Sequence, residues 1–274
     1  MNHIEGKVVL LTGASGGIGE CIAVSLAKEA ATVVCVSRSQ ESLQKVSDLV
    51  DANGGIGVSI PWDISKIEEL PLLIKQVKQL VGDVDILINN AAIEKYESFE
   101  RYTQQDIKSI LTTNLFAVME LTRLVLPQMI ERDRGHIVNI TSGSGKKGIA
   151  YNSVYSGSKA GLWVWTDALR QELSSSNIGV SIVSPGYTDA GMYAKSGLTA
   201  PSSARVAPVI EVATAVLDAI KSRKVEVIID GFGAKLLFAI AQFFPEFVDT
   251  IYRKIGITGL YESYVKSKAV KHNT

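Results

Sequence analysis

Short β-branched, apolar runs alternate with amphipathic stretches along most of the chain. Seven runs are predicted to be strands, and several show little alternation, as expected of parallel strands covered on both faces. The expected strands are Lys7–Leu11, Thr32–Ser37, Gly57–Trp62, Val84–Ile88, His136–Thr141, Val180–Ser184 and Val225–Ile229. Apolar residues at helical spacing predict helices at Gly17–Glu29, Gln40–Ala52, Ile67–Val81, Gln104–Glu131, Val154–Ser175 and Val209–Ser222.

This regular β-α-β-α order predicts one doubly wound α/β domain with a seven-stranded parallel sheet flanked by helices. Two regions depart from the order. The connection Gly186–Pro208 is too long and irregular for a simple turn, which is typical of a functional loop. The residues from 232 to 274 are expected to form an apolar helical extension of a catalytic domain that spans residues 1–231.

The extension contains the run Leu236–Phe244, which is almost entirely apolar and stops at Pro245. This run is far shorter than the roughly 20 residues that a membrane-spanning helix needs. Three interpretations remain open for it. It is a helix packed on the same domain or on a partner subunit, a lid over a hydrophobic pocket, or a peripheral membrane contact through residues 232–254.

The composition of the chain argues against some classes of function. Basic and acidic residues number 28 each, so no net field favours nucleic acid, and we expect no nucleic-acid partner. The chain has only three histidines, two of them near its ends, and Cys21 and Cys35 lack zinc spacing, so we expect no metal site. The first residues lack a long apolar signal segment, and we therefore expect a cytoplasmic protein, with peripheral membrane association as a further possibility.

A glycine-rich turn follows the first expected strand. Residues 12–19 read TGASGGIG, and glycines at 13, 17 and 19 allow a tight turn and a close approach to a ligand. The helix that follows directs free N–H groups and the positive end of its dipole at the same space, which suits a pyrophosphate. A turn that only packs a helix is the alternative, and its place between a strand and a helix favours the phosphate interpretation.

Further motifs follow in order: Asn89-Asn-Ala-Ala92, then Asn114, Ser142, Tyr155, Lys159 and Pro185-Gly186. With the glycine turn, they resemble the short-chain dehydrogenase/reductase family over about residues 6–230. The resemblance implies a Rossmann-type fold, oxidoreductase activity on CH–OH and C=O groups, and a nicotinamide cofactor. It also implies a homodimer or homotetramer that pairs through Gln104–Glu131 and Val154–Ser175, where Trp163 and Trp165 are candidates for either interface or core.

Tyr155 and Lys159 are four residues apart in a predicted helix, so their side chains share one face. A nearby ammonium favours phenolate, and we expect Lys159 to lower the pKa of Tyr155 toward working pH. The resemblance implies that Tyr155 protonates the carbonyl oxygen and that Lys159 binds the nicotinamide ribose. It implies that Ser142 stabilises charge on that oxygen, and that Asn114 holds a helix kink and a water leading to Lys159.

The end of the second strand indicates which cofactor is used. An acidic residue there would accept bonds from the ribose hydroxyls, whereas this chain has Ser37 followed by Arg38, whose guanidinium can pair with a 2′-phosphate. A solvated loop arginine is the alternative, and we predict preference for NADP(H). The expected cofactor-binding residues are Gly13, Ser15, Gly17, Ile18, Gly19, Ser37, Arg38, Ser39, Asp63, Ile64, Asn90, Ala91, Tyr155, Lys159, Pro185, Gly186 and Thr188.

The residues expected near the substrate are mostly apolar or aromatic, which favours a hydrophobic ketone or aldehyde, lipid-like in the case of a long chain. They are Ser144, Tyr151, Tyr187 and Met192, with Ile93, Glu94 and Tyr193 close by. We therefore predict an NADPH-dependent carbonyl reductase. The alternatives are a non-catalytic NADP(H)-binding sensor on the same fold and an NAD(P)-dependent alcohol dehydrogenase that works in the oxidative direction.

Overall fold

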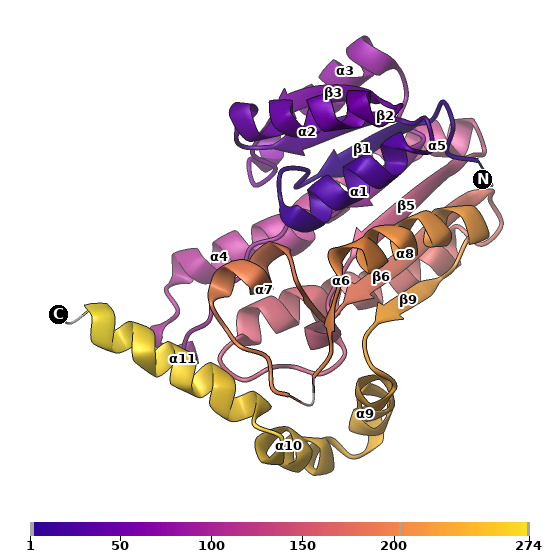
Figure 1. Ribbon diagram of the computed structural model, residues 1–274. Coiled ribbons are helices and arrows are strands. Elements are labelled where there is room, and N and C mark those ends of the chain that lie inside the picture. Colours follow the sequence, from indigo (N-terminus) through magenta and orange to yellow (C-terminus); the bar gives the residue numbers. More distant parts are fainter. Residues whose placement is uncertain (1–2, 203, 273–274) are drawn as a thin grey trace.

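A computed structural model describes residues 3–202 and 204–272 (Figure 1). Within them, seven parallel strands form one sheet in the order β3-β2-β1-β4-β5-β6-β9. The predicted doubly wound sheet is therefore confirmed. The strands are β1 (Val8–Thr12), β2 (Thr32–Ser37), β3 (Ile56–Pro61), β4 (Ile86–Asn89), β5 (Gly135–Ile140), β6 (Ile178–Pro185) and β9 (Glu226–Ile229).

Each face of the sheet is covered by three helices, and successive residues of the strands alternate between the two cores. One core packs against α1 (Gly17–Ala27), α2 (Gln40–Ala52) and α8 (Val209–Ser222). The other core packs against the helices α3 (Leu70–Val81), α5 (Ala117–Glu131) and α6 (Ser153–Glu172). Because both faces are buried, the strands need apolar residues at nearly every position, which explains their unbroken apolar runs.

The helix expected at Gln104–Glu131 is not uniform. It consists of α4 (Gln104–Leu111), the π-helical segment η3 (Thr112–Phe116) and α5. Asn114 lies in the middle of η3 and is fully buried. A π-helical segment inside an α-helix is frequently found at a functional site, and here it coincides with the residue that the motif order singled out.

The connection predicted as an irregular loop contains short regular elements. Within the described part of Gly186–Pro208, they are β7 (Tyr187–Thr188), α7 (Gly191–Ser196) and β8 (Val206–Ala207), and β7 pairs with β8. Single-turn segments also occur at η1 (Ile67–Glu69), η2 (Phe99–Arg101) and η4 (Gly143–Gly145).

The described part of the C-terminal extension forms three helices, α9 (Phe232–Phe243), α10 (Pro245–Lys254) and α11 (Ile257–His272). Pro245 ends the apolar run as expected, but it also begins α10, because proline suits the first turn of a helix. Figure 1 shows these helices as a chain that passes beyond the sheet and runs back toward α4 and α7. Tyr261 of α11 contacts Tyr187 and Tyr96, so the extension packs on loops of the same chain.

Candidate active site

The glycine turn between β1 and α1 has the tight geometry that its sequence predicts. Gly13 has a φ of 67°, and a Cβ at this position would lie 2.8 Å from the Ala91 Cα. A Cβ on Gly19 would lie 2.2 Å from the Gly13 carbonyl oxygen, which no side chain can tolerate. Only glycine can therefore occupy these two positions of the turn, which lies next to the N-terminal N–H groups of α1.

Asn90 fixes this turn to the end of β4. Its side-chain Nδ2 donates to the carbonyl oxygens of Thr12 at 3.0 Å and Gly13 at 3.1 Å. The Thr12 hydroxyl in turn accepts from the backbone N–H groups of Asn90 and Ala91, each at 3.1 Å. The Asn90 side chain therefore stabilises the glycine turn and also forms part of the cleft wall.

A cleft of about 640 Å³ extends from the glycine turn toward β2 and β3. At its far end the Ser15 hydroxyl donates to the Ser37 hydroxyl at 2.8 Å, and Asp63 accepts from the Ser65 hydroxyl at 2.7 Å. Arg38 lines the same end and is exposed. Twelve of the expected cofactor-binding residues line this cleft: Gly13, Ser15, Gly17, Ile18, Gly19, Ser37, Arg38, Ser39, Asp63, Ile64, Asn90 and Ala91.

The remaining expected cofactor residues line a second cavity of about 600 Å³, which adjoins the cleft at Ile18, Asn90 and Met192. They are Tyr155, Lys159, Pro185, Gly186 and Thr188. Thr188 is buried there, and its hydroxyl donates to the Ala190 carbonyl oxygen at 3.0 Å. The structure thus brings all of these predicted positions to two connected spaces.

Ser142, Tyr155 and Lys159 meet at one wall of the second cavity. Tyr155 and Lys159 lie on α6 and are both buried, and the Lys159 Nζ donates to the Ile140 carbonyl oxygen at 2.9 Å. The Lys159 Nζ lies 5.7 Å from the centre of the Tyr155 ring. Ser142 follows β5 and is hydrogen-bonded to Tyr155. The lysine ammonium is therefore fixed by the carbonyl at the end of β5, and a hydrogen bond links the tyrosine and serine side chains.

Asn114 lies behind this wall. Its Oδ1 accepts from the Ile93 N–H at 2.8 Å, while its Nδ2 donates to the Ile93 carbonyl oxygen at 2.9 Å and to the Ser158 hydroxyl at 3.0 Å. Ser158 itself donates to the Tyr155 carbonyl oxygen at 2.7 Å. Asn114 thus ties the segment after β4 to the turn of α6 that carries Tyr155 and Lys159.

The ionisation of the pair differs from the sequence prediction. The expected lowering of the Tyr155 pKa is wrong: burial raises it well above its ordinary value, the Glu94 carboxylate raises it further, and the hydrogen bond with Ser142 only partly opposes them. Burial lowers the pKa of Lys159 to about 8, although Glu94 acts in the opposite direction. At neutral pH the tyrosine is a phenol that can donate a proton, and the lysine is mostly an ammonium.

Most of the second cavity is apolar, and the C-terminal helices form much of its wall. The lining residues from the extension include Leu236, Leu237, Phe238, Ile251, Tyr252, Ile255, Ile257 and Tyr261. The Tyr187 and Tyr261 hydroxyls are 2.8 Å apart, and the Tyr261 ring stacks on that of Tyr96, with 5.3 Å between centres. These contacts hold α11 against the loop that follows β6 and the segment that follows β4.

Three of the four expected substrate residues line this cavity, namely Ser144, Tyr187 and Met192. Tyr151 is a correction, because it does not belong to the lining. Its φ of 63° turns the chain there, and its carbonyl oxygen accepts from the Glu97 N–H at 2.8 Å. The sequence analysis placed Tyr151 among the mostly apolar or aromatic residues near the substrate, but the turn before α6 leaves it outside the lining of the cavity.

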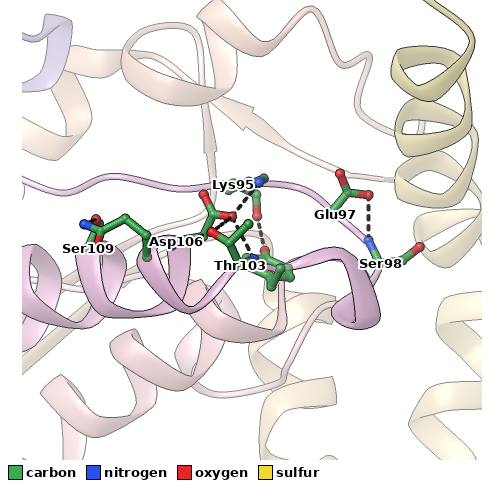
Figure 2. Close-up of polar contacts among 8 residues, drawn as sticks. Lys95, Glu97, Ser98, Thr103, Asp106 and Ser109 are labelled. Atoms are coloured by element: carbon green, nitrogen blue, oxygen red, sulfur yellow. Dashed lines mark hydrogen bonds and ion pairs between the residues drawn. The ribbon is translucent and has the colours of Figure 1, made fainter. Parts of the chain in front are cut away.

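The segment after β4 is rigidly built (Figure 2). Thr103 and Asp106 form a reciprocal capping box at the start of α4, and Lys95 pairs with the same Asp106 carboxylate at 2.7 Å. The Tyr102 hydroxyl also donates to the Lys95 carbonyl oxygen. These bonds fix the backbone next to Glu94, which lines the second cavity.

Comparisons with known proteins agree with this arrangement. Residues 7–200 match the short chain dehydrogenase family. The chain belongs to the short-chain dehydrogenase/reductase family. It is therefore an oxidoreductase that acts on CH–OH and C=O groups, as the resemblance implied.

Among its relatives, ketoacyl reductase HetN of Nostoc sp. is 47% identical over 98% of this chain and 96% of that protein. The 3-oxoacyl-(acyl-carrier-protein) reductase FabG of Escherichia coli is 35% identical over 69% of this chain and 77% of that protein. A solved short-chain dehydrogenase of Sphingobium yanoikuyae in complex with NADPH superimposes with a TM-score of 0.74. It is 29% identical, and the match covers 81% of this chain and 87% of that chain.

The sequence did not predict several lining residues. Asp230, Arg205 and the buried Asn152 line the second cavity, while Lys108 and Lys195 line the cleft. The hydrophobicity of the C-terminal extension could have indicated that Phe238 and Tyr261 line a cavity, because so many apolar side chains must pack against another apolar surface. No local signal identifies Asp230, which reaches the site only because β9 ends beside β6.

Proposed function

We propose that the protein is an NADPH-dependent carbonyl reductase whose substrate is a hydrophobic ketone of the 3-oxoacyl class. The observation that carries this proposal is the place of Ser142, Tyr155 and Lys159 in the wall of a mainly apolar cavity that adjoins a nucleotide-sized cleft. The names of the relatives HetN and FabG, both reductases of oxoacyl groups, support the choice of substrate class.

The residues of the cleft fit a nicotinamide dinucleotide phosphate. The glycine turn would bind the pyrophosphate. The hydroxyls of Ser15 and Ser37 and the guanidinium of Arg38 would bind the 2′-phosphate, since none of these three side chains is a carboxylate that would repel it. When bound, the cofactor supplies the hydride. The protein contributes binding, orientation and control of the proton.

In this proposal the Tyr155 phenol donates its proton to the substrate oxygen, and the Ser142 hydroxyl stabilises the charge that develops there. The Lys159 ammonium donates to the Ile140 carbonyl oxygen; it would also bind the nicotinamide ribose and favour proton delivery from Tyr155. Asn114 is a positioning residue, because its amide is bonded to Ile93 and Ser158. Its role in holding a water that leads to Lys159 stays a prediction.

Because burial raises the pKa of Tyr155, this residue is at neutral pH the phenol that proton donation in the direction of reduction requires. The test is NADPH consumption with 3-oxoacyl thioesters and simple ketones of graded chain length, with NADH in parallel. We expect turnover that rises with chain length. NADPH binding without turnover of any member of the series would favour the sensor instead.

Arg38→Gln should lower the kcat/KM ratio of NADPH to NADH by about 10- to 100-fold, because a charge-assisted bond to the 2′-phosphate is lost. The matched control is Lys45→Gln, an exposed cation on α2 that pairs with Glu41 and does not line the cleft. Steady-state rates with both cofactors measure the ratio. Equal kcat/KM for NADPH and NADH in the unmodified protein would contradict the NADP(H) proposal.

We also propose a homodimer or homotetramer that pairs through α4–α6. Leu111, Phe116 and Val164 expose apolar side chains on these helices, which supports such an interface. Trp163, considered above as an interface anchor, is instead buried within the chain, where its Nε1 donates to Glu226 at 3.1 Å. Light scattering that gives the mass of one chain would contradict this proposal.

Peripheral membrane contact through residues 232–254 is a further proposal. Four phenylalanines on α9 and α10 or between them are exposed, namely Phe232, Phe243, Phe244 and Phe247. The opposite side of the same two helices lines the second cavity. Co-sedimentation with lipid vesicles should fall for Phe243→Ser/Phe247→Ser. Equal partitioning of this variant and the unmodified protein would contradict the contact. Cytoplasmic location stays a prediction.

A further inference from the structure

Glu94 is one of the ionisable groups in the wall of the second cavity that have no role in the mechanism above. Glu94 follows β4 and borders both this cavity and a groove on the outer side of the segment. Its carboxylate is hydrogen-bonded by the Tyr96 hydroxyl and by the Asn152 Nδ2 at 3.4 Å. A carboxylate has about four lone-pair positions, so two internal bonds leave it able to accept more.

Asn152 adds a second acceptor to the same wall. It is 4% exposed and lies at the start of α6, one turn before Tyr155. Because its Nδ2 faces the carboxylate, its amide orientation is fixed, and its buried Oδ1 has no hydrogen-bond partner among the described residues. A buried acceptor without a donor costs free energy, and a small shift of this side chain would let a ligand donor relieve that cost.

Glu94 also faces charges from several elements. Lys159 of α6 and Lys268 of α11 both lower its pKa, whereas burial, which is the largest effect, raises it. Tyr155, Tyr96 and Tyr261 lie near enough for the Glu94 charge to raise their own pKa values. The carboxylate is thus placed in a mainly apolar cavity beside the reacting groups, where a bond from a neutral donor is worth more than in water.

We propose that Glu94, supported by Asn152, accepts a hydrogen bond from an amide N–H or an O–H on the part of the substrate beyond the reacting carbonyl, and so favours ketones that carry such a donor. This inference rests on the proposed carbonyl reduction and adds the chemical class of a group beyond the ketone. A substrate oriented in this way places its carbonyl at Tyr155 and its donor at Glu94. Its hydrophobic part then lies along the wall that α9 and α10 form.

The test uses two matched pairs of ketones. One pair is an N-alkyl 3-oxoamide and its N-methylated counterpart, and the other is a hydroxyketone and its methyl ether. In the unmodified protein, kcat/KM for the donor-bearing member should exceed that of its blocked partner by about tenfold or more in at least one pair, because a buried acceptor left without a donor costs free energy. The pair that shows the preference identifies whether N–H or O–H is the donor.

Glu94→Leu should bring this ratio close to one, and Glu94→Gln, which keeps the shape and an acceptor oxygen, should lower it by a smaller factor. The matched control is Glu97→Gln, since Glu97 borders only the outer groove and accepts from the Ser98 N–H at 3.0 Å. The ratio in this control should equal that of the unmodified protein. If Glu94→Leu does not fold, Glu94→Gln carries the test.

The ratio separates recognition from other roles of Glu94. A change in the electrostatics of Tyr155 or Lys159 would alter kcat for both members of a pair equally, so the ratio would not move. Calorimetric binding of the same four ligands gives a readout that does not require turnover. Equal binding and equal kcat/KM within both pairs would overturn the Glu94 proposal, whereas a preference in binding with no reduction of any ketone would overturn the proposed function alone.

Discussion

Tyr155→Phe is expected to lower kcat for ketone reduction by about 10²- to 10⁴-fold, the range typical of a lost general acid. The ring of this residue is buried, and phenylalanine fills the same space, so the fold and the cavity should be preserved. Only the hydroxyl that faces Ser142 is removed. Single-turnover rates with saturating NADPH and a long-chain 3-oxoacyl thioester measure the loss.

Two further measurements make this result specific. The affinity for NADPH, from fluorescence titration, should change by less than about threefold, because the glycine turn and Arg38 are untouched. Tyr151→Phe serves as the matched control, since Tyr151 is the neighbouring tyrosine that does not line the cavity, and its turnover should stay near that of the unmodified protein. Near-normal turnover of Tyr155→Phe would refute the assignment of the proton donor.

Local sequence patterns predict the parts of this protein that local physics determines. The bounds of β2, α2 and α8 agree with the predictions, because each element has its own periodicity and clear ends. The glycine turn was predictable for a similar reason: a Cβ on Gly19 would meet the Gly13 carbonyl oxygen of the same turn, and Gly13 has a positive φ. The spacing of Tyr155 and Lys159 likewise places both on one helical face without any knowledge of the rest of the chain.

Long-range packing explains what the sequence did not predict. Tyr187 and Tyr261 are 74 residues apart, and Glu94 and Asn152 are 58 residues apart, so no local pattern relates them. The direction of the Tyr155 pKa was predicted from one neighbour, Lys159, whereas burial by the complete cavity dominates it. Electrostatic predictions from spacing alone therefore fail where several distant elements together remove water from a group.

The C-terminal extension shows the same limit in another way. Its hydrophobicity predicted contact with something apolar but not which surface, and three interpretations were left open. The stacking of Tyr261 on Tyr96 and the buried Phe238 beside Gly143 show that one side covers the cavity of this chain. The exposed phenylalanines of α9 and α10 form a different side, and for that side the membrane contact remains a proposal.

Lys159→Met is expected to lower kcat/KM by about 10²- to 10³-fold and to remove the alkaline limb of the pH profile. Methionine keeps the stem packed in the buried wall but removes the ammonium that donates to the Ile140 carbonyl. The variant should also weaken NADPH binding, unlike Tyr155→Phe, because the ammonium is proposed to hold the ribose. Rates and cofactor titrations between pH 6 and 10 measure both effects.

The sign of the pH effect follows from the depressed pKa of Lys159. That pKa is lowered to about 8 by burial, so the ammonium is present below this pH and is lost above it. In the unmodified protein kcat/KM should therefore be flat up to about pH 7.5 and then fall about tenfold per pH unit above 8. Tyr155 cannot produce this limb, since burial raises its pKa far above the same range.

An exposed lysine, replaced in Lys78→Met, is the control and should keep the full profile. A limb that persists near pH 8 in Lys159→Met would assign the titration to another group and contradict the role proposed for this ammonium.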